Sequence, residues 1–367
     1  MYKNNNVVVI GAGKIGSAII KHLTSIKAQG DYKVTVIDSY QPSLDAISDI
    51  VQETILMPIT DVASLRQHLG GQAAVLSAAD FTANKIIAEA CLLEGCSYFD
   101  LTEDVETTAH VKELSKKIDQ DAKQIFMPQC GLAPGFIGIL AHSLTEQFDQ
   151  IHDVRLRVGA LPKNPQNIMK YNLTWSTSGL VNEYFNTGEA IIDGDLIITQ
   201  PLEGLETLSI DGTDYEAFNT SGGLGYLHHT LAGKVRNLDY KTIRYPGHAE
   251  YMKFLKNDLD MGERRDLLEK IFDESVPVAE EDQVVIFASV TGLKDGKNTY
   301  VNDARIIPNG VYYNEPWTGI QITTASGICA VVDMFFEGQL PQNGFVNQEE
   351  VKLEEFLQNR FGSAYNN

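Results

Sequence analysis

Cysteine is scarce in this chain of 367 residues. The four cysteines are Cys91, Cys96, Cys130 and Cys329. They form no C-x-x-C pair and stand among apolar residues, which argues against a disulfide framework and against a structural zinc site. The adjacent histidines His228 and His229 add no metal site, because neighbouring side chains on a helix point about 100° apart. We therefore predict buried free thiols and no bound metal.

Positive charge and long apolar runs are also in short supply. The chain has 29 Lys and Arg against 49 Asp and Glu, a net charge of −20, which repels phosphate backbones and anionic lipids at long range. The most hydrophobic long stretch, Ile328 to Phe336, contains Asp333 and is far shorter than the roughly 20 residues of a membrane span. The N-terminus shows no apolar segment of a signal peptide. We predict a cytoplasmic protein that binds neither nucleic acid nor membranes.

The first 130 residues alternate short β-branched runs with longer stretches of helical spacing. The six runs are Val7–Ile10, Lys33–Ile37, Thr54–Met57, Ala74–Ser77, Ser97–Leu101 and Gln124–Met127. Strand–helix units of roughly 20–30 residues are typical of a parallel sheet that is covered by helices on both faces. We therefore predict an α/β protein with a doubly wound parallel sheet, the Rossmann fold, in residues 1–133.

The alternation changes at residues 131–135, which read GLAPG. Beyond them, Val154–Val158 alternates apolar and basic residues, as a half-exposed strand does. Asp282–Gly292 and Thr299–Pro308 flank an Asp-Gly pair that favours a hairpin turn. Strands with one polar face predict a mixed sheet, so we expect an inserted α+β substrate domain over residues 134–316.

Helical spacing appears in four further stretches. Two of them interrupt the second domain, at Gly247–Lys256 and Glu263–Phe272. A long apolar helix is expected after Trp317, and another over Asn347–Phe361. We expect this last part of the chain, residues 317–367, to return to the Rossmann domain.

The run GAGKIG over residues 11–16 follows the first apolar strand and opens a helical pattern. In that context G-x-G-x-x-G binds the pyrophosphate of a dinucleotide at a helix N-terminus. Gly11 makes the tight turn, Gly13 lets the backbone approach the pyrophosphate, and Gly16 allows close packing of helix on strand. The predicted cofactor contacts in this run are Gly11, Gly13, Lys14, Ile15 and Gly16.

Asp38 ends the second strand, 22 residues beyond the last glycine of the turn, where the ribose-binding acid of such domains lies. Its carboxylate would accept hydrogen bonds from both ribose hydroxyls and repel a 2′-phosphate, and the next residues include no Arg or Lys. We therefore expect NAD rather than NADP. Asp80 is expected to cap the helix that begins after it. By position, four further residues should border the cofactor: Asp61, Val62, Ser77 and Ala78.

Three unusual runs lie in the second domain, at residues 171–184 (YNLTWSTSGLVNEY), 216–225 (EAFNTSGGLG) and 241–248 (KTIRYPGH). With the glycine turn, the Tyr98-Phe99-Asp100 segment and the GLAPG segment, they resemble the saccharopine dehydrogenase (saccharopine reductase)-like family, most closely its lysine 6-dehydrogenase branch. The resemblance covers nearly the whole chain. It implies a nicotinamide-dependent oxidoreductase acting on a carbon–nitrogen bond of a lysine-derived amino acid, with a homodimer formed through the second domain.

An amino-acid substrate needs a cation for its carboxylate. Arg244 is our candidate, because its planar guanidinium matches a carboxylate bidentately. Ser221 and the backbone of Gly222 are expected to add donors. Tyr171 and Trp175 either line the aliphatic chain of the substrate or belong to the core.

Oxidation of an amine requires a neutral nitrogen, so an ammonium with a pKa of about 10.4 must first lose a proton. The candidate bases are Asp100, Glu103, Tyr245 and His248. His248 has an unperturbed pKa in the right range, but it follows Pro-Gly and is also suited to open the next helix. The sequence leaves the choice between His248 and an acidic group near the fifth strand open.

Four functions fit these residues. The first is NAD-dependent lysine 6-dehydrogenase, which releases ammonia. The second is saccharopine reductase, which needs a second carboxylate clamp. Its candidates are Arg155, Arg157, Lys170 and Lys241. The third is an imine reductase that makes carboxylated polyamines, and the fourth is a cofactor-bound redox sensor without turnover.

Overall fold

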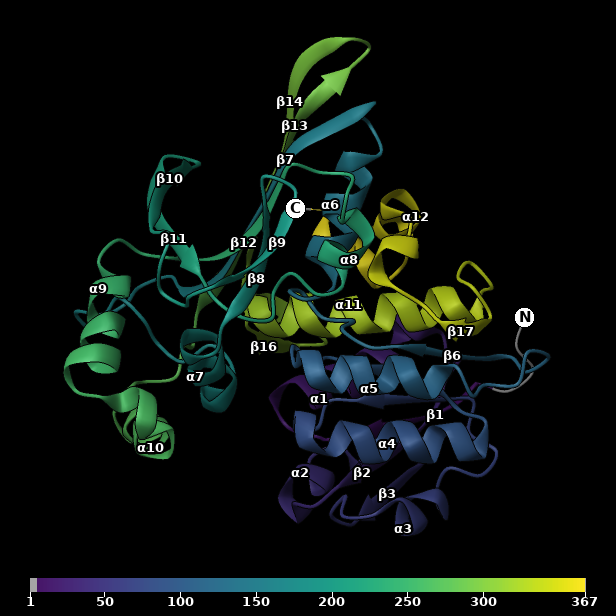
Figure 1. Ribbon diagram of the computed structural model, residues 1–367. Helices are drawn as coiled ribbons and strands as arrows, with labels where there is room; N and C mark the ends of the chain where they lie inside the picture. Colours follow the sequence, from purple (N-terminus) through teal and green to yellow (C-terminus); the bar gives the residue numbers. More distant parts are fainter. Residues whose placement is uncertain (1–4, 367) are drawn as a thin grey trace. The chain divides into compact units, whose positions relative to one another are not determined.

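The computed structural model describes residues 5–366, which divide into two compact units (Figure 1). The first unit holds the described residues up to Ile139 together with Gln321–Asn366, and the second unit holds Leu140–Ile320. The sequence places the domain limits a few residues away, at 133/134 and 316/317, and those limits remain predictions.

The first unit is built on a parallel sheet of seven strands. In the order in which they lie in the sheet, the strands are β17 (Asn343–Phe345), β6 (Gln124–Met127), β5 (Ser97–Asp100), β4 (Ala74–Ser77), β1 (Asn6–Ile10), β2 (Lys33–Asp38) and β3 (Glu53–Leu56). The last six follow the order of a doubly wound dinucleotide-binding sheet, which confirms the predicted fold class. β17 was not predicted, because the three residues Asn-Gly-Phe carry no β-branched pattern.

Helices connect these strands and bury their apolar faces against them. They are α1 (Lys14–Thr24), η1 (Ile26–Ala28), α2 (Gln41–Asp45), η2 (Ser48–Ile50), α3 (Val62–Arg66), α4 (Phe81–Glu94) and α5 (Val105–Ser115). The next helix, α6 (Phe136–Thr145), follows β6 and continues into the second unit. Figure 1 shows α4 and α5 side by side along the sheet. The interior of β1, Val7-Val8-Val9, is fully apolar and buried, as in a sheet covered on both faces.

The predicted long apolar helix is α11 (Gly319–Phe336). It has the length and composition of a membrane span, yet 83% of it is buried inside the fold. Its Ser326 hydroxyl lies 3.1 Å from Nε2 of His22 on α1. A Cβ added at Gly327 would lie 2.9 Å from the carbonyl oxygens of Cys130 and Gly131, so the absence of a side chain lets that loop pass close to the helix. α11 is therefore a core helix of the first unit.

The prediction of a single helix over Asn347–Phe361 is wrong. The chain forms instead η5 (Gln348–Glu350), α12 (Leu353–Gln358) and η6 (Gly362–Tyr365). Asn347 and Glu350 form a capping box that starts η5, and the Asn359 side chain accepts hydrogen bonds from the backbone N–H groups of Phe361 and Gly362, which ends α12. Side-chain hydrogen bonds to the local backbone thus interrupt the helical pattern.

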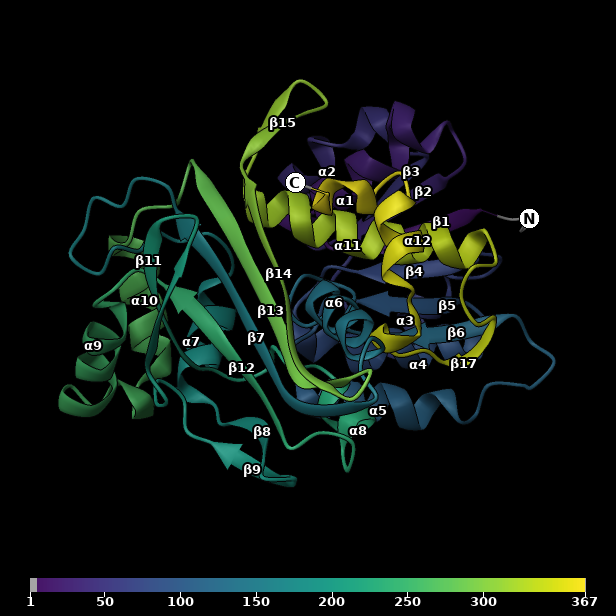
Figure 2. The same ribbon diagram turned by 90° about the horizontal axis from the view of Figure 1, so that it is seen from above.

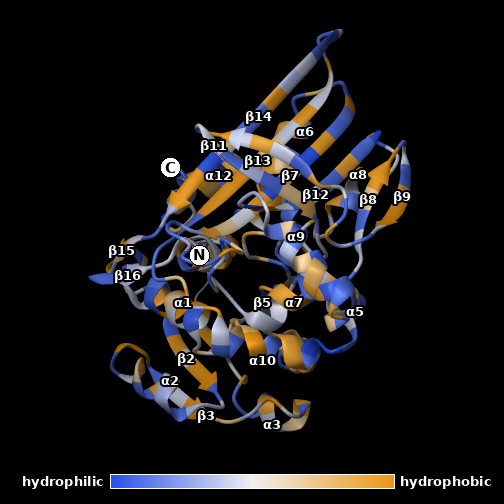
Figure 3. Cartoon of the chain, turned by 90° about the vertical axis from the view of Figure 1, so that its left-hand side faces the viewer, coloured by the Kyte–Doolittle hydropathy of each residue, from blue (hydrophilic) through white to orange (hydrophobic). Residues whose placement is uncertain are grey.

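The second unit is built on a mixed sheet, as predicted (Figure 2). Its main path is β10 (Glu206–Ile210), β11 (Thr213–Asn219), β12 (Asn237–Arg244), β7 (Gln150–Pro162), β13 (Asp282–Lys294) and β14 (Lys297–Pro308). In addition, β8 (Gly188–Ile192) pairs with β12, and β9 (Asp195–Thr199) pairs with β8. β12 and β7 run parallel and the other pairs antiparallel. Asp295 and Gly296 both have positive φ in the β13–β14 turn, which confirms the predicted hairpin. Figure 3 shows apolar and polar bands alternating along these strands.

Helices of the second unit enclose an apolar cluster of their own. They are α7 (Thr177–Phe185), α9 (His248–Lys253), η3 (Phe254–Asp258), η4 (Met261–Glu263) and α10 (Arg265–Ser275). None of the described residues of the short helix α8 (Leu227–Leu231) belongs to this cluster. A small two-stranded ribbon, β15 (Gly310–Tyr312) and β16 (Glu315–Trp317), precedes α11. α9 and α10 begin and end within three residues of the predicted helix limits. The last turn of the helix predicted to end at Lys256 belongs to the π-helix η3 instead.

Candidate functional site

The glycine turn between β1 and α1 has the close backbone contacts that the motif predicts. Gly11 has φ +95°, and its N–H donates to the Ile37 carbonyl at 2.8 Å. A Cβ added at Gly11 would lie 2.7 Å from the Ala78 carbonyl oxygen. A Cβ added at Gly16 would lie 1.9 Å from the Gly11 carbonyl oxygen, so any side chain at either position would force the turn apart.

The turn leaves room for a phosphate where the motif requires it. A Cβ added at Gly13 would meet nothing within 4 Å, so this backbone faces open space. α1 begins at Lys14, and in this described helix no side chain caps the N-terminus and no acid stands in the first turn. Such a helix end presents N–H groups and a partial positive charge to an anion. These residues therefore fit the pyrophosphate of a dinucleotide.

The Asp38 carboxylate is held at the end of β2 beside this turn. Its Oδ2 accepts from the Ala12 N–H at 2.5 Å and its Oδ1 from the Tyr40 N–H at 2.8 Å. No Lys or Arg occurs between Lys33 and Arg66. The segment that follows β2 therefore offers no cation to a 2′-phosphate.

The other residues predicted to contact the cofactor lie either at the start of α3 or at the end of β4. Asp61 is exposed and caps α3 by accepting from the Ser64 N–H at 2.9 Å, and these Ser64 bonds lower the pKa of its carboxyl. Val62 is the first residue of α3. The Ser77 hydroxyl donates to Asn84 at 2.6 Å, while the Ala78 backbone packs against Gly11. Their contact with a cofactor remains a prediction.

Asp80 caps α4, as expected, by accepting from the Thr82 N–H at 3.0 Å.

Asp100, the last residue of β5, is fully buried and uses both of its carboxylate oxygens. Oδ2 accepts from the Tyr98 hydroxyl at 2.6 Å, and Oδ1 accepts from the backbone N–H groups of Gln129 and Thr102 at 2.8 and 3.0 Å. Burial raises the pKa of Asp100 to about 6, against the opposing effect of these hydrogen bonds. Gln129 has φ +64°, so the carboxylate holds a left-handed residue in the loop that leads to Gly131.

Glu103 follows three residues after Asp100 and is partly buried. Burial raises the pKa of its carboxyl, and the nearby carboxylates of Asp104 and Asp100 raise it further. A raised pKa is the property that a general base near neutral pH requires.

Arg244 ends β12 and is only 3% exposed. Its Nε donates to the Tyr184 hydroxyl at 2.7 Å and its Nη1 donates to the Ile243 carbonyl at 2.9 Å. Nη2 lies 3.9 Å from Oε2 of Glu183, which is an ion pair without a direct hydrogen bond. The rings of Tyr171 and Tyr184 lie 5.2 and 5.6 Å from the guanidinium carbon, within the range of cation–π attraction.

His248 opens α9, as the sequence allows, and is buried beside this arginine. Its Nε2 lies 2.9 Å from the Tyr184 hydroxyl and its Nδ1 lies 2.9 Å from the Met169 carbonyl. Burial, and then the charge of Arg244, lowers the pKa of His248 to about 3, so the ring is neutral near pH 7. The Tyr245 hydroxyl donates to the Pro162 carbonyl at 3.0 Å instead.

Tyr171 and Trp175 pack in the apolar cluster of the second unit, Tyr171 fully buried and Trp175 partly buried. The Trp175 ring would lie 2.3 Å from a Cβ at Gly179 of α7. The Ser221 hydroxyl donates to the Asn182 carbonyl at 3.2 Å, and Gly222 has φ +82°. The helix that follows, α8, has five residues and begins only at Leu227, so Ser221 and Gly222 do not stand at its N-terminus.

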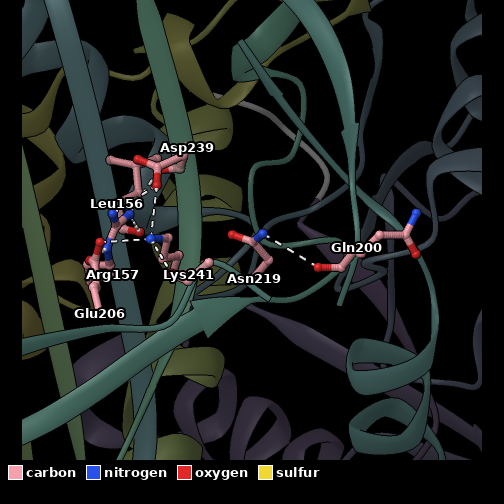
Figure 4. Close-up of polar contacts among 8 residues, drawn as sticks. Leu156, Arg157, Gln200, Glu206, Asn219, Asp239 and Lys241 are labelled. Carbon is pink, nitrogen blue, oxygen red and sulfur yellow. Dashed lines mark hydrogen bonds and ion pairs between the residues drawn. The ribbon is translucent and has the colours of Figure 1, made fainter. Parts of the chain in front are cut away.

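Two of the four cations considered for a second carboxylate clamp are paired inside the fold (Figure 4). Arg157 is 1% exposed, contacts Glu206, and donates to Asp239 at 2.9 Å. Lys241 lies 2.7 Å from Glu206 and donates to the Gly204 carbonyl at 2.6 Å. Figure 4 also shows Asn219 beside Gln200 of the same sheet region.

Lys170 donates to the Pro246 carbonyl at 3.1 Å, and Arg155 is exposed on β7.

Two residues of this arrangement, Glu183 and Tyr184, received no role from the sequence. They stand in the run at residues 171–184, but nothing in that run shows that they meet Arg244, which is about 60 residues away along the chain. The four cysteines are buried free thiols, as predicted. Across residues 5–366, no group of three or more His, Cys, Asp or Glu side chains is arranged to hold a metal ion.

Comparisons with known proteins cover both units. Residues 7–125 match the family model of the saccharopine dehydrogenase NADP binding domain, and residues 131–361 match that of the saccharopine dehydrogenase C-terminal domain. Saccharopine dehydrogenase (NADP(+), L-glutamate-forming) from Pyricularia oryzae is 23% identical over 314 residues, which are 82% of this chain and 67% of that protein.

Solved structures share the fold at low sequence identity. Apo saccharopine dehydrogenase (L-Glu forming) from Saccharomyces cerevisiae has a TM-score of 0.76 at 14% identity, over 99% of this chain and 96% of that chain. Homospermidine synthase from Legionella pneumophila, solved in complex with NAD, has a TM-score of 0.66 at 13% identity, over 99% of this chain and 90% of that chain.

Proposed function

The chain belongs to the saccharopine dehydrogenase family of amino-acid dehydrogenases, and we propose that it oxidises L-lysine at its ε-carbon with NAD, the lysine 6-dehydrogenase reaction. The overall reaction converts lysine, NAD⁺ and water to the 6-semialdehyde, NADH, ammonium and one proton. When bound, the nicotinamide supplies the hydride acceptor at the carbon that bears the nitrogen.

The observation that carries the choice of substrate is the pairing of the cations. Nη2 of Arg244 lies 3.9 Å from the Glu183 carboxylate without a direct hydrogen bond to it, so Arg244 is a cation of the kind that the carboxylate of an α-amino acid requires. Arg157 and Lys241 are held by internal carboxylates and would have to leave them to bind a ligand. Of the four candidates for a second clamp this leaves Arg155 and Lys170. The smaller choice of cations for a second carboxylate supports a substrate with a single carboxylate over saccharopine.

Residues of this chain must also receive the proton of the substrate ammonium. Both ring nitrogens of His248 have partners, and both oxygens of Asp100 accept internal hydrogen bonds. Glu103 is thus the acidic candidate we favour for the base. Its raised pKa supports this role.

The use of NAD is part of the same proposal. The matching family model is described as an NADP binding domain, and the Pyricularia relative is named for NADP(+). The carboxylate of Asp38 and the lack of Lys and Arg from residue 34 to residue 65 support NAD for this chain. We further propose a cytoplasmic homodimer that acts on a small molecule and, at a net charge of −20, binds neither nucleic acid nor membranes.

The deciding experiment is a steady-state assay of the purified chain with lysine plus NAD and with saccharopine plus NAD. Ammonia and glutamate are measured as products. We expect lysine to be oxidised with release of ammonia and no turnover of saccharopine.

Glutamate formation from saccharopine would instead identify a saccharopine dehydrogenase, the second candidate, which the name of the Pyricularia relative favours. Binding of the cofactor without turnover of lysine, saccharopine or carboxylated polyamines would identify a redox sensor.

A further inference from the structure

Tyr184, on α7, lies between Arg244 and His248 and has no part in the function proposed above. Its side chain is fully buried. Its hydroxyl oxygen lies 2.7 Å from Nε of Arg244 and 2.9 Å from Nε2 of His248. Nδ1 of His248 continues the series to the Met169 carbonyl oxygen at 2.9 Å. Four groups from separate parts of the second unit therefore form one chain of hydrogen bonds.

The direction of each hydrogen bond in this chain follows from its ends. The Met169 carbonyl can only accept, so Nδ1 of His248 carries the proton and donates to it. The guanidinium Nε of Arg244 can only donate, so the Tyr184 oxygen accepts there. The single hydroxyl proton of Tyr184 then points to Nε2 of His248, the acceptor of a neutral ring. A charged ring would have protons on both nitrogens and would break this order.

We propose that Tyr184 and His248 are positioning residues that hold the Arg244 guanidinium with its Nε edge occupied. Nε donates to Tyr184, one proton of Nη1 goes to the Ile243 carbonyl, and Nη2 lies 3.9 Å from Glu183 without a direct hydrogen bond. The N–H groups that remain for a ligand are therefore at the Nη1–Nη2 end of the guanidinium. A substrate carboxylate would then be bound end-on by Nη1 and Nη2. The side-on arrangement through Nε and Nη2 is closed to it.

This inference rests on the proposed function, because it assigns Arg244 to the substrate carboxylate. It adds which edge of the guanidinium binds and what keeps it there. The tyrosine rings on the guanidinium, at 5.2 and 5.6 Å, allow it to turn in its own plane, whereas the hydrogen bond at Nε does not.

The kinetic test compares Tyr184→Phe with wild type on two substrates, L-lysine and 1,5-diaminopentane, which lacks the carboxylate. Tyr184→Phe removes the hydroxyl and keeps the ring. We expect KM for lysine to rise about 10- to 100-fold, the loss of one hydrogen bond to a charged group, with kcat changed less than about threefold. kcat/KM for 1,5-diaminopentane should stay the same in both proteins. Equal losses on both amines, or no loss on lysine, would overturn the proposal.

Tyr215→Phe is the matched control. Tyr215 is 1% exposed in the same unit, and its hydroxyl accepts from Gln283 at 3.4 Å, with no contact to Arg244. This variant should have the KM of wild type. An effect as large as that of Tyr184→Phe would assign the change to general packing and overturn the proposal.

A spectroscopic measurement tests the chain of hydrogen bonds independently of any substrate. In protein labelled with ¹⁵N-histidine, His248, assigned with a His248→Gln variant, should be a neutral ring protonated at Nδ1 from pH 7 to pH 5. A ring protonated at Nε2, or a charged ring at pH 7, would overturn the proposal. If wild type does not oxidise lysine but shows the Nδ1–H ring, the proposed function fails and the positioning of Arg244 stands.

Discussion

The Asp38 side chain spans the glycine turn and the end of β2, with one oxygen on each backbone segment. Asp38→Ala removes the charge that we expect to bind the ribose hydroxyls and to repel a 2′-phosphate. The ratio of the Kd for NAD to the Kd for NADP should therefore rise by about 10-fold or more, equivalent to about 1.4 kcal/mol. Calorimetric titration of the protein with NAD and with NADP measures both constants.

Asp49→Ala, which removes an exposed acid of η2, is the control and should leave the ratio unchanged. Wild-type protein that binds and uses NADP at least as well as NAD would contradict the ribose assignment.

Replacement of Arg244 should affect catalysis on lysine, because we assign this residue to the substrate carboxylate. Arg244→Ala should lower kcat/KM for lysine by about 30- to 1000-fold, because a charge-assisted contact of about 2–4 kcal/mol is lost. Arg244→Lys should recover only part of the loss, since a point charge does not reproduce the planar fork. The Kd for NAD should not change. Steady-state kinetics on folded protein measure each of these quantities.

Arg236→Ala supplies the comparison, because Arg236 is a 68% exposed arginine of the same unit whose partner is Asp193. It should retain the kcat/KM of wild type. If Arg244→Ala did the same, Arg244 would have no contact with the substrate.

At the scale of elements, β5 and the loop after β6 are joined through the buried Asp100 carboxylate. Its pKa is raised from 3.8 to about 6, so between these values the folded protein holds a proton that the unfolded chain has lost. The contribution of Asp100 to the free energy of unfolding therefore falls as pH rises from 4 to 6 and is level above that.

Asp100→Asn removes this titration and keeps a side chain of the same shape. The free energy of unfolding of the variant, relative to wild type, should rise by about 2–3 kcal/mol between pH 4 and pH 7. Urea unfolding at the two pH values gives the difference. A difference that is independent of pH, or that falls over this range, would show that the folded-state pKa is not raised.

At the scale of the whole molecule, an ion-pair network around the buried Asp333 carboxylate joins Arg360 to the rest of the first unit. Arg360 contacts Asp333 of α11 at 2.5 Å and Asp31 at 2.7 Å. Tyr32 and Asn359 also donate to Asp333, at 2.6 and 2.8 Å. The network thus joins a residue after β17 to α11 and to the loop before β2.

Arg360→Ala leaves the Asp333 carboxylate, which is 2% exposed, without its cation. We expect the first unit to lose about 2–4 kcal/mol of unfolding free energy, because an unpaired buried charge costs more than the pair contributes. Chemical denaturation measures the loss.

Lys352→Ala removes a lysine that is 78% exposed and pairs with Glu355 on the surface. It should lower the free energy of unfolding by less than about 1 kcal/mol. The double variant Asp333→Asn/Arg360→Ala should be more stable than Arg360→Ala alone, since no uncompensated charge remains. A double variant as unstable as the sum of its parts would contradict this account.

Several features of this protein are encoded by residues that are neighbours in the chain. The six parallel strands, the glycine turn, the Asp-Gly hairpin and the Asp80 cap follow from periodicity and turn chemistry over a few residues. Side chains alternate along a strand, so Lys241 and Arg244, three residues apart on β12, belong to opposite faces, and they take separate partners, Glu206 and Tyr184.

Contacts between residues that are far apart in the sequence depend on how the helices and strands pack. Three such contacts join residues far apart in the chain. They are the pairing of Arg157 with Glu206 and Asp239, the addition of β17 to the parallel sheet, and the hydrogen bond between Arg244 and Tyr184. Packing also sets the pKa values of two buried groups, lowering that of His248 and raising that of Asp100, because desolvation depends on all the atoms around a group. Local pattern fixes which residues share a face of one element, and only the packing of several elements fixes the partners that give those residues their chemistry.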